Sequence, residues 1–313
     1  MRQLLQKIFR PFFIWLAIKF SSSPKRADVF KSLSKLYSNL QSEKSKRGIV
    51  LDINIVTDKF IIFSDQHKGV KDWADDFKDN EPNYLFALEY YYKQGYSYIN
   101  LGDCEELWKN KAETVLPLNQ LSLQAEAAFQ KVKKYYRTFG NHDLLWKNKL
   151  DVAMLLKDYF QMPLPVYEGI ILRTTIAGHD IKILLTHGHQ GDKLSDNNAF
   201  STWIVAHIWA PIQRYLQINI NTPSTDLYLR DKHNRLMYEW SSEKKDTLLI
   251  TGHTHKPVFA SGKYSYDDGH KIEIADSIKN TKASYFNTGC CCYNDGDITG
   301  IELADGYMRL IKW

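Results

Sequence analysis

The sequence is poor in cysteine, and this shortage narrows the kind of protein it can encode. Only four cysteines occur in 313 residues, and three of them are consecutive at Cys290–Cys292. Adjacent cysteines bridge poorly, and the spacing fits neither a disulfide framework nor a zinc knuckle. We therefore interpret the triplet as a buried strand near an active-site rim, and we expect a reducing, cytoplasmic compartment.

Long apolar runs are also missing. The uninterrupted apolar run Pro11–Ile18 is too short to span a bilayer. No Ala-x-Ala site follows it and Lys19 is badly placed, so a cleaved signal peptide is not favoured. Internal repeats, low-complexity segments and a Gly-rich phosphate loop are absent as well. With 44% hydrophobic residues, the chain can bury one large core or two modest ones.

The net charge of +5 is unevenly distributed. Residues 1–50 contain eleven Lys or Arg and two acidic residues, so they carry +9 and leave −4 for the rest. Apolar residues within the first twenty recur at helical spacing, with Gln3, Lys7 and Arg10 on the opposite face. They are Leu4, Leu5, Ile8, Phe9, Phe12 and Leu16. Such a basic amphipathic helix fits an anionic membrane surface, although packing on the protein's own core or on a partner is the alternative.

A second amphipathic helix is predicted from Asp28 to Gln41, followed by a polar linker at Ser42–Arg47. We therefore divide the chain into a basic N-terminal region, 1–47, and a folded domain, 48–313. Helices are predicted at Tyr84–Lys93 and Leu121–Lys134, and a tight-turned β-hairpin over residues 298–311.

The histidines are concentrated in short segments. Six of the ten lie in Asp65–His67, Gly140–Asp143, His187–His189 and Gly252–His255, and Gly102–Glu106 adds a carboxylate segment. Each segment directly follows an apolar run that we interpret as a strand. These runs are Phe60–Phe63, Tyr98–Leu101, Tyr135–Phe139, Ile181–Leu185 and Thr247–Ile250.

Loops at the carboxyl ends of strands in one α/β sheet converge on one crevice. Asp, Asn and His gathered there are ligands typical of a hydrolytic metal centre. Singly, Asp65 could be a helix N-cap, Asn141 a turn residue, and either of His253 and His255 a polar group near a strand end. Five such coincidences would be needed together, so the joint pattern favours the metal site.

The order Asp-x-His, Gly-Asp, Gly-Asn-His-Asp, His, Gly-His-x-His resembles the calcineurin-like metallophosphoesterase superfamily, from about Phe60 to about Asn287. The resemblance implies a layered α/β fold, a β-sandwich flanked by helices. It further implies two divalent metal ions. The ligands of one would be Asp65, His67, Asp103 and His255, and those of the other Asp103, Asn141, His187 and His253. His142 would act at the leaving group, oriented by Asp143.

The chemistry explains these residue types. Two cations about 3.5–4 Å apart neutralise phosphate charge and activate a hydroxide that attacks phosphorus. A bridging carboxylate holds two metal ions at that separation, so the assignment of Asp103 as the bridging ligand is the central one. Histidine side chains titrate near neutral pH, so His142 can supply a proton to the leaving group. In Gly252–His255 we expect an extended segment, on which both imidazoles point the same way. A turn would then direct one imidazole to each metal. The mixed ligand set favours Mn²⁺, with Fe or Zn²⁺ as alternatives.

Several residues near the motifs are less defined. His189 stands where many relatives have Asp, and we expect it behind the ligands or facing the substrate. Asp192 could orient a ligand or form a turn. Four histidines outside the motifs are treated as ordinary surface or core residues, namely His179, His207, His233 and His270. The segment from about 195 to 246 interrupts the strand rhythm and predicts a helical insertion, either a cap beside the site or a helical pair on the core.

One segment bears on the substrate through a second resemblance, namely Gly102-Asp103-Cys104-Glu105-Glu106-Leu107-Trp108. This segment resembles the Gly-Asp-x-x-Glu-x-Trp form of the UDP-2,3-diacylglucosamine pyrophosphatases, although well-known members carry Arg at the position of His142. We therefore expect a hydrolase of phosphoester or pyrophosphate bonds whose substrate is a phosphorylated small molecule or a lipid-linked nucleotide. Residues 1–20 would place it peripherally at the inner face of a membrane. A general phosphodiesterase, a phosphomonoesterase, a nuclease and a non-enzymatic scaffold are the alternatives. Nucleic acid is disfavoured because positive charge concentrates at the N-terminus.

Overall fold

The computed structural model describes residues 2–19, 24–42, 47–176, 178–192, 212, 215–216, 227–259 and 284–313. Two six-stranded sheets form its centre. The first sheet has the order β1 (Gly48–Asp52), β6 (Gly169–Ile176), β7 (His179–Thr186), β8 (Thr247–Thr251), β10 (Tyr285–Asn287), β9 (Val258–Phe259). The second has the order β12 (Tyr307–Lys312), β11 (Thr299–Ala304), β2 (Phe60–Phe63), β3 (Ser97–Asn100), β4 (Tyr135–Thr138), β5 (Val166–Tyr167).

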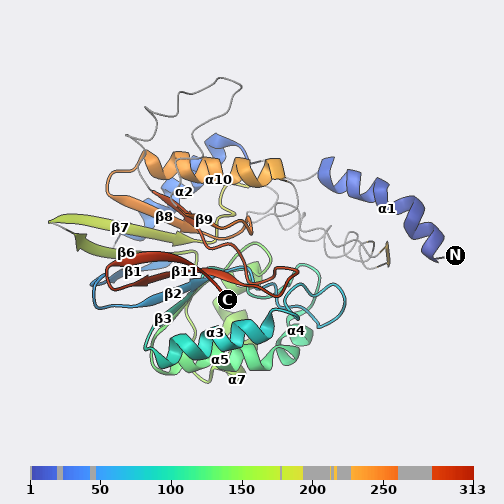
Figure 1. Ribbon diagram of the computed structural model, residues 1–313, viewed down its shortest axis with the longest axis horizontal. Helices are drawn as coiled ribbons and strands as arrows, with labels where there is room; N and C mark the ends of the chain where they lie inside the picture. Colours follow the sequence, from blue (N-terminus) through green and yellow to red (C-terminus); the bar gives the residue numbers. More distant parts are fainter. Residues whose placement is uncertain are drawn as a thin grey trace.

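The two sheets pack face to face, and helices cover their outer faces (Figure 1). Helices α2 (Arg26–Gln41) and α10 (Leu227–Ser242) share a buried cluster with the first sheet. The second sheet is covered by α3 (Glu81–Lys93), α5 (Gln120–Lys131) and α7 (Lys157–Phe160). Shorter helical segments lie beside them at α4 (Ala112–Leu118), η1 (Leu144–Lys147) and α6 (Lys149–Leu155). The result is a four-layered mixed α/β fold, which confirms the predicted helix-flanked β-sandwich.

Strand β2 shows why the central strands are apolar throughout. All four of its residues are buried. Phe60 and Ile62 belong to the cluster between the two sheets, whereas Ile61 and Phe63 belong to the cluster under the helices. Since side chains alternate across a strand, a strand covered on both faces needs an apolar residue at every position.

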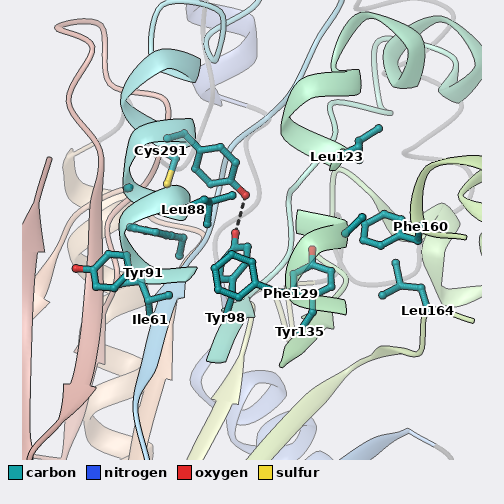
Figure 2. Close-up of a cluster of buried hydrophobic side chains, with 14 of the residues drawn as sticks. Ile61, Leu88, Tyr91, Tyr98, Leu123, Phe129, Tyr135, Phe160, Leu164 and Cys291 are labelled. Atoms are coloured by element: carbon teal, nitrogen blue, oxygen red, sulfur yellow. Dashed lines mark hydrogen bonds between the residues drawn. The ribbon is translucent and has the colours of Figure 1, made fainter. Parts of the chain in front are cut away.

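The aromatic side of the second sheet is shown in Figure 2. Tyr98, Tyr135, Phe129 and Phe160 pack between the strands and the helices that cover them. Cys291 lies in the same core. The whole cysteine triplet is buried, as expected, but it follows β10 in a loop and is not itself a strand.

The strands at the histidine motifs are placed as predicted, with ends shifted by at most two residues. The three strand pairs that carry most of the motifs are parallel, namely β2–β3, β3–β4 and β7–β8. The predicted hairpin is also present. Asp305 and Gly306 both have positive φ, and Ala304 pairs with Tyr307, which is the geometry of a two-residue turn between twisted strands.

The N-terminal region consists of two different helices. Helix α2 buries Val29, Leu33, Leu36 and Leu40 against the first sheet, so it is part of the layered structure. The division at residue 47 stays a prediction. Helix α1 (Arg2–Lys19) continues through Pro11 and projects away from the sheets (Figure 1). Most of the insertion at 195–246 lies outside the described residues, and α10, within it, packs on the core.

Candidate metal centre

The seven predicted ligands lie at one end of the sandwich, and both sheets contribute them. Asp65, His67, Asp103 and Asn141 follow strands β2, β3 and β4 of the second sheet, whereas His187, His253 and His255 follow β7 and β8 of the first. The expectation that all these loops follow strands of one sheet is wrong: the crevice lies where the ends of two packed sheets meet. All of these side chains are buried except His255, which is partly exposed.

The backbone at the site is strained. Five of the predicted ligands have positive φ, between 51° and 69°, and they are Asp65, His67, Asp103, His253 and His255. Asp and His tolerate this left-handed region better than most residues, and such conformations cluster at functional sites. The expectation of an extended Gly252–His255 segment is therefore wrong. Positive φ at both histidines makes the segment a turn, and this turn sends the two rings to different neighbours.

One group of side chains surrounds Asp65. Its Oδ1 atom lies 3.3 Å from Nε2 of His255 and 3.8 Å from Nε2 of His67. The two imidazoles face each other, with 3.1 Å between their Nε2 atoms. Backbone N–H of His253 donates to the Asp65 carboxylate at 2.9 Å, and Ser64 donates to it as well. These bonds fix the carboxylate in one orientation.

A second group surrounds His187. Its Nδ1 donates to the carbonyl of Leu101 at 2.9 Å, which leaves Nε2 to face the site. That atom lies 3.1 Å from Oδ2 of Asp103 and 3.1 Å from Oδ1 of Asn141. The ring of His253 packs edge-on to His187 at 5.1 Å between centroids, and Asp103, His187 and His253 are close enough to hold one ion.

Asp103 lies between the two groups. The same Oδ2 atom that is 3.1 Å from Nε2 of His187 is 3.7 Å from Nε2 of His67. Its other oxygen, Oδ1, accepts the backbone N–H of His142 at 2.7 Å. A carboxylate with one oxygen pinned and the other facing both imidazole groups has the placement that a bridging ligand requires.

The electrostatics of the site fit cations held among these residues. Burial raises the pKa of Asp65, but His255 and His187 more than offset it, so the pKa lies well below its usual range. Burial lowers the pKa of His67, and the carboxylates of Asp65 and Glu106 raise it well above normal. Nε2 of His253, within the described part of the chain, is buried without a hydrogen-bond partner. Carboxylates that stay ionised, and an imidazole nitrogen that has no hydrogen-bond partner, are suited to bind divalent metal ions.

His142 lies beside this centre, and its surroundings differ from the prediction. Nδ1 of His142 lies 2.9 Å from both carboxylate oxygens of Glu106, and its ring stacks on Trp108 at 4.2 Å. Asp143 does not orient this ring. Its carboxylate instead accepts backbone N–H groups of Gly140 at 2.6 Å and Cys104 at 2.9 Å. Sequence reasoning missed this role of Glu106, although the Gly-Asp-x-x-Glu-x-Trp segment contained the signal.

Behind the site lies a buried network of charges. The guanidinium of Arg137 pairs with Glu105 and lies 3.4 Å from Asp143. Lys68 pairs with Glu126 and is 3.5 Å from Glu105. All five side chains are fully buried. Since Glu105 and Asp143 belong to the loops that carry Asp103 and His142, this network holds the two loops together.

Three further residues reach the site. Cys292 Sγ lies 3.6 Å from Nδ1 of His255, so the cysteine loop contacts the ligands from one side. His189 is buried and its ring centroid is 5.3 Å from that of His187, so it lies next to a predicted ligand. The sequence predicts no special role for His233, yet α10 places it against His253 with 5.1 Å between ring centroids. His207 and His270 lie outside the described residues.

Comparison with known proteins identifies the family of the chain. Residues 58–257 match the calcineurin-like phosphoesterase family, so the chain belongs to that family. It is a metal-dependent phosphoester hydrolase, and the family implies a dinuclear divalent metal centre. Among solved structures, a dimetal phosphatase from Danio rerio matches with 9% identity and a TM-score of 0.37, over 82% of this chain and 96% of that one. No curated protein matches the chain.

Proposed function

We propose that Asp65, His67, Asp103 and His255 hold one divalent cation, and that Asp103, Asn141, His187 and His253 hold the second. The observation that carries this assignment is the position of Asp103 Oδ2 between His67 and His187. Mn²⁺ is our choice of metal because the set mixes carboxylate, amide and imidazole ligands, with Fe or Zn²⁺ as alternatives. When bound, such ions neutralise phosphate charge and lower the pKa of a water molecule.

The protein's own residues would then act on the leaving group. Glu106 accepts from Nδ1 of His142, which leaves Nε2 to donate a proton to the departing oxygen. Trp108 stacks on the same ring and limits its rotation. Asp143 positions the loop backbone, and it supports catalysis through that loop without contact to the substrate.

For the substrate we propose a lipid-linked nucleotide with a pyrophosphate bond, such as UDP-2,3-diacylglucosamine. Support comes from Glu106 and Trp108, because both residues that define the Gly-Asp-x-x-Glu-x-Trp form contact His142. A general phosphodiesterase or phosphomonoesterase is the second candidate, since the metal-centred groups themselves do not discriminate between phosphate esters.

A membrane location supports the lipid-linked substrate. In α1, Ile8, Phe9, Phe12 and Trp15 are exposed, with about half of each side chain in contact with solvent. Helix α1 contacts the segment at residues 215–216, where Gln6 donates to the carbonyl of Tyr215 and Arg10 to the carbonyl of Leu216. We propose that this apolar face enters the boundary of an anionic membrane. No helix in the described part of the chain is long and apolar enough to cross a membrane.

One hydrolysis panel tests the proposal. The full-length protein with Mn²⁺ is given UDP-2,3-diacylglucosamine, the same nucleotide sugar without acyl chains, a simple phosphodiester, a phosphomonoester and single-stranded DNA. We expect the highest kcat/KM on the diacylated substrate. Equal rates with and without acyl chains would remove the lipid specificity, and preference for the simple esters would favour the second candidate.

A further inference from the structure

His233 occupies an unusual environment for a buried histidine. It lies on α10, its exposed fraction is 1%, and neither of its ring nitrogens has a hydrogen-bond partner among the described residues. Burying an imidazole without a partner is unfavourable, because the ring loses its hydrogen bonds to water. A leucine at this position would have a lower free-energy cost of burial. We therefore expect a partner that binds the ring nitrogens of His233.

The groups around His233 are also ligand types. Its ring packs edge-on to that of His253, at an interplanar angle of 69°, and Nε2 of His253 is likewise buried without a hydrogen-bond partner. Asp192, on the loop after β7, has an exposed fraction of 1%. One ligand atom from each of Asp192, His233 and His253 lies within 4.8 Å of the others. Two imidazoles and one carboxylate gathered at this distance form a common protein site for divalent transition metals.

The segments that carry His233 and His253 are held in place. Asn234, next to His233, accepts from the hydroxyl of Thr254 at 2.9 Å and from that of Tyr285 at 2.8 Å. Asn287 donates to the carbonyl of Gly252. These bonds tie α10 to the turn that carries His253, so His233 and His253 face each other through a preorganised contact.

We propose that Asp192, His233 and His253 bind a third divalent cation beside the dinuclear centre. His253 belongs to both groups of ligand atoms. It can face the dinuclear centre with one ring nitrogen and this ion with the other if its N–H proton is released to solvent, so that the ring bridges the two sites as an imidazolate. The histidine-rich donor set favours Zn²⁺ or another borderline transition metal over Mg²⁺ or Ca²⁺. The ion would connect α10 to the metal centre, which gives α10 a role in holding His253.

The number of bound metals tests this proposal without any measurement of activity. The full-length protein is stripped with chelator and titrated with Co²⁺ and with Zn²⁺, and the bound metal per chain is counted after gel filtration. Wild-type protein is expected to bind three equivalents, and the third Co²⁺ should add its own visible absorption bands. His233→Leu should bind two equivalents and lose those bands. His179→Leu, at an exposed histidine of β7, is the matched control and should retain three.

Folding of each variant is checked by thermal melting, and Asp192→Asn replaces His233→Leu if the latter does not fold. Asp192→Asn should weaken binding of the third equivalent at least tenfold while the first two are unchanged. Saturation of the wild-type protein at two equivalents overturns the proposal. So does a third equivalent that every folded variant of Asp192 and His233 retains at full affinity.

Discussion

Glu106 joins two imidazoles of the site. Its carboxylate lies 2.9 Å from Nδ1 of His142 and 3.3 Å from Nδ1 of His67, so one side chain orients both the predicted proton donor and a predicted metal ligand. Metal ligands and catalytic histidines commonly depend on such a partner, which fixes the ring and its tautomer.

His142→Ala should lower turnover roughly 10²–10⁴-fold, because the departing oxygen loses its proton donor. The bound metals should remain. The loss should shrink on a nitrophenyl ester, whose leaving group needs no proton. Glu106→Gln is the companion variant, and it should cost less, about 10–100-fold, because the ring is still present but poorly oriented. Equal losses on good and poor leaving groups would argue against proton donation by His142.

Asp103→Asn should abolish most activity and release at least one metal ion per chain. The amide retains a neutral oxygen, but it loses the negative charge that two cations share. Elemental analysis and steady-state turnover on one preparation check both effects. A variant that keeps the wild-type metal content and near-normal turnover would contradict the bridging assignment.

Arg137→Met should destabilise the fold by about 3–5 kcal/mol, because it removes the guanidinium from the fully buried carboxylates of Glu105 and Asp143 and leaves Glu105 with only the more distant Lys68. Urea unfolding measures the change. Arg173→Met is the matched control: Arg173 pairs with Asp52 at the surface, and loss of that pair should cost no more than about 1 kcal/mol. Similar costs for the two variants would show that the buried network contributes little.

The metal-free protein should lose stability as the pH rises. Burial lowers the pKa of His255, but the thiolate of Cys290 and the carboxylate of Asp65 raise it to about 10, above the ordinary value of 6.5. A raised pKa means that the protonated ring stabilises the fold fully below pH 6.5, and that this contribution is lost as the pH rises through 10. Thermal melting of the chelated protein between pH 6.5 and 10 should show the decline, and His255→Gln should show a smaller one. An identical decline in both proteins would exclude His255 as its source.

Deletion of residues 1–20 should abolish sedimentation with anionic liposomes and spare hydrolysis of a small soluble diester. The apolar face supplies burial, and Lys7, Arg10 and Lys19 can each add about 1 kcal/mol near anionic headgroups. The double variant Phe9→Ser/Phe12→Ser keeps the charge and should also lose most binding. High salt should weaken binding of the full-length protein without eliminating it. Full-length protein that ignores such liposomes would favour packing on the core or on a partner.

Much of the fold could be predicted because it depends on local patterns. Apolar runs located β2, β4 and β8, and the histidine segments after them predicted which loops meet. The assignment of those strands to two sheets could not be predicted, because a buried strand has the same apolar composition in either sheet. The sandwich interface joins Ile62 to residues such as Ile170 and Ile250, which are far apart in the sequence.

The predicted site was incomplete where contacts are long-range. Glu106 and His142 are separated by 36 residues, and neither sequence position shows that their side chains meet. Asp143 follows His142 directly, yet its carboxylate turns to the backbone of Gly140 and Cys104. His233 lies within a helix whose neighbours are known only from the packing of α10 on the first sheet.

The origin of the ligands in two different sheets has a consequence for the cell. Asp65 and His67 belong to one sheet and His255 to the other, so ions held between them would crosslink the halves of the sandwich. Anything that binds only the native state shifts the folding equilibrium toward it. Metal supply would therefore govern how much of this protein survives proteolysis as well as how fast the protein hydrolyses its substrate. Under metal starvation its abundance should fall together with its activity.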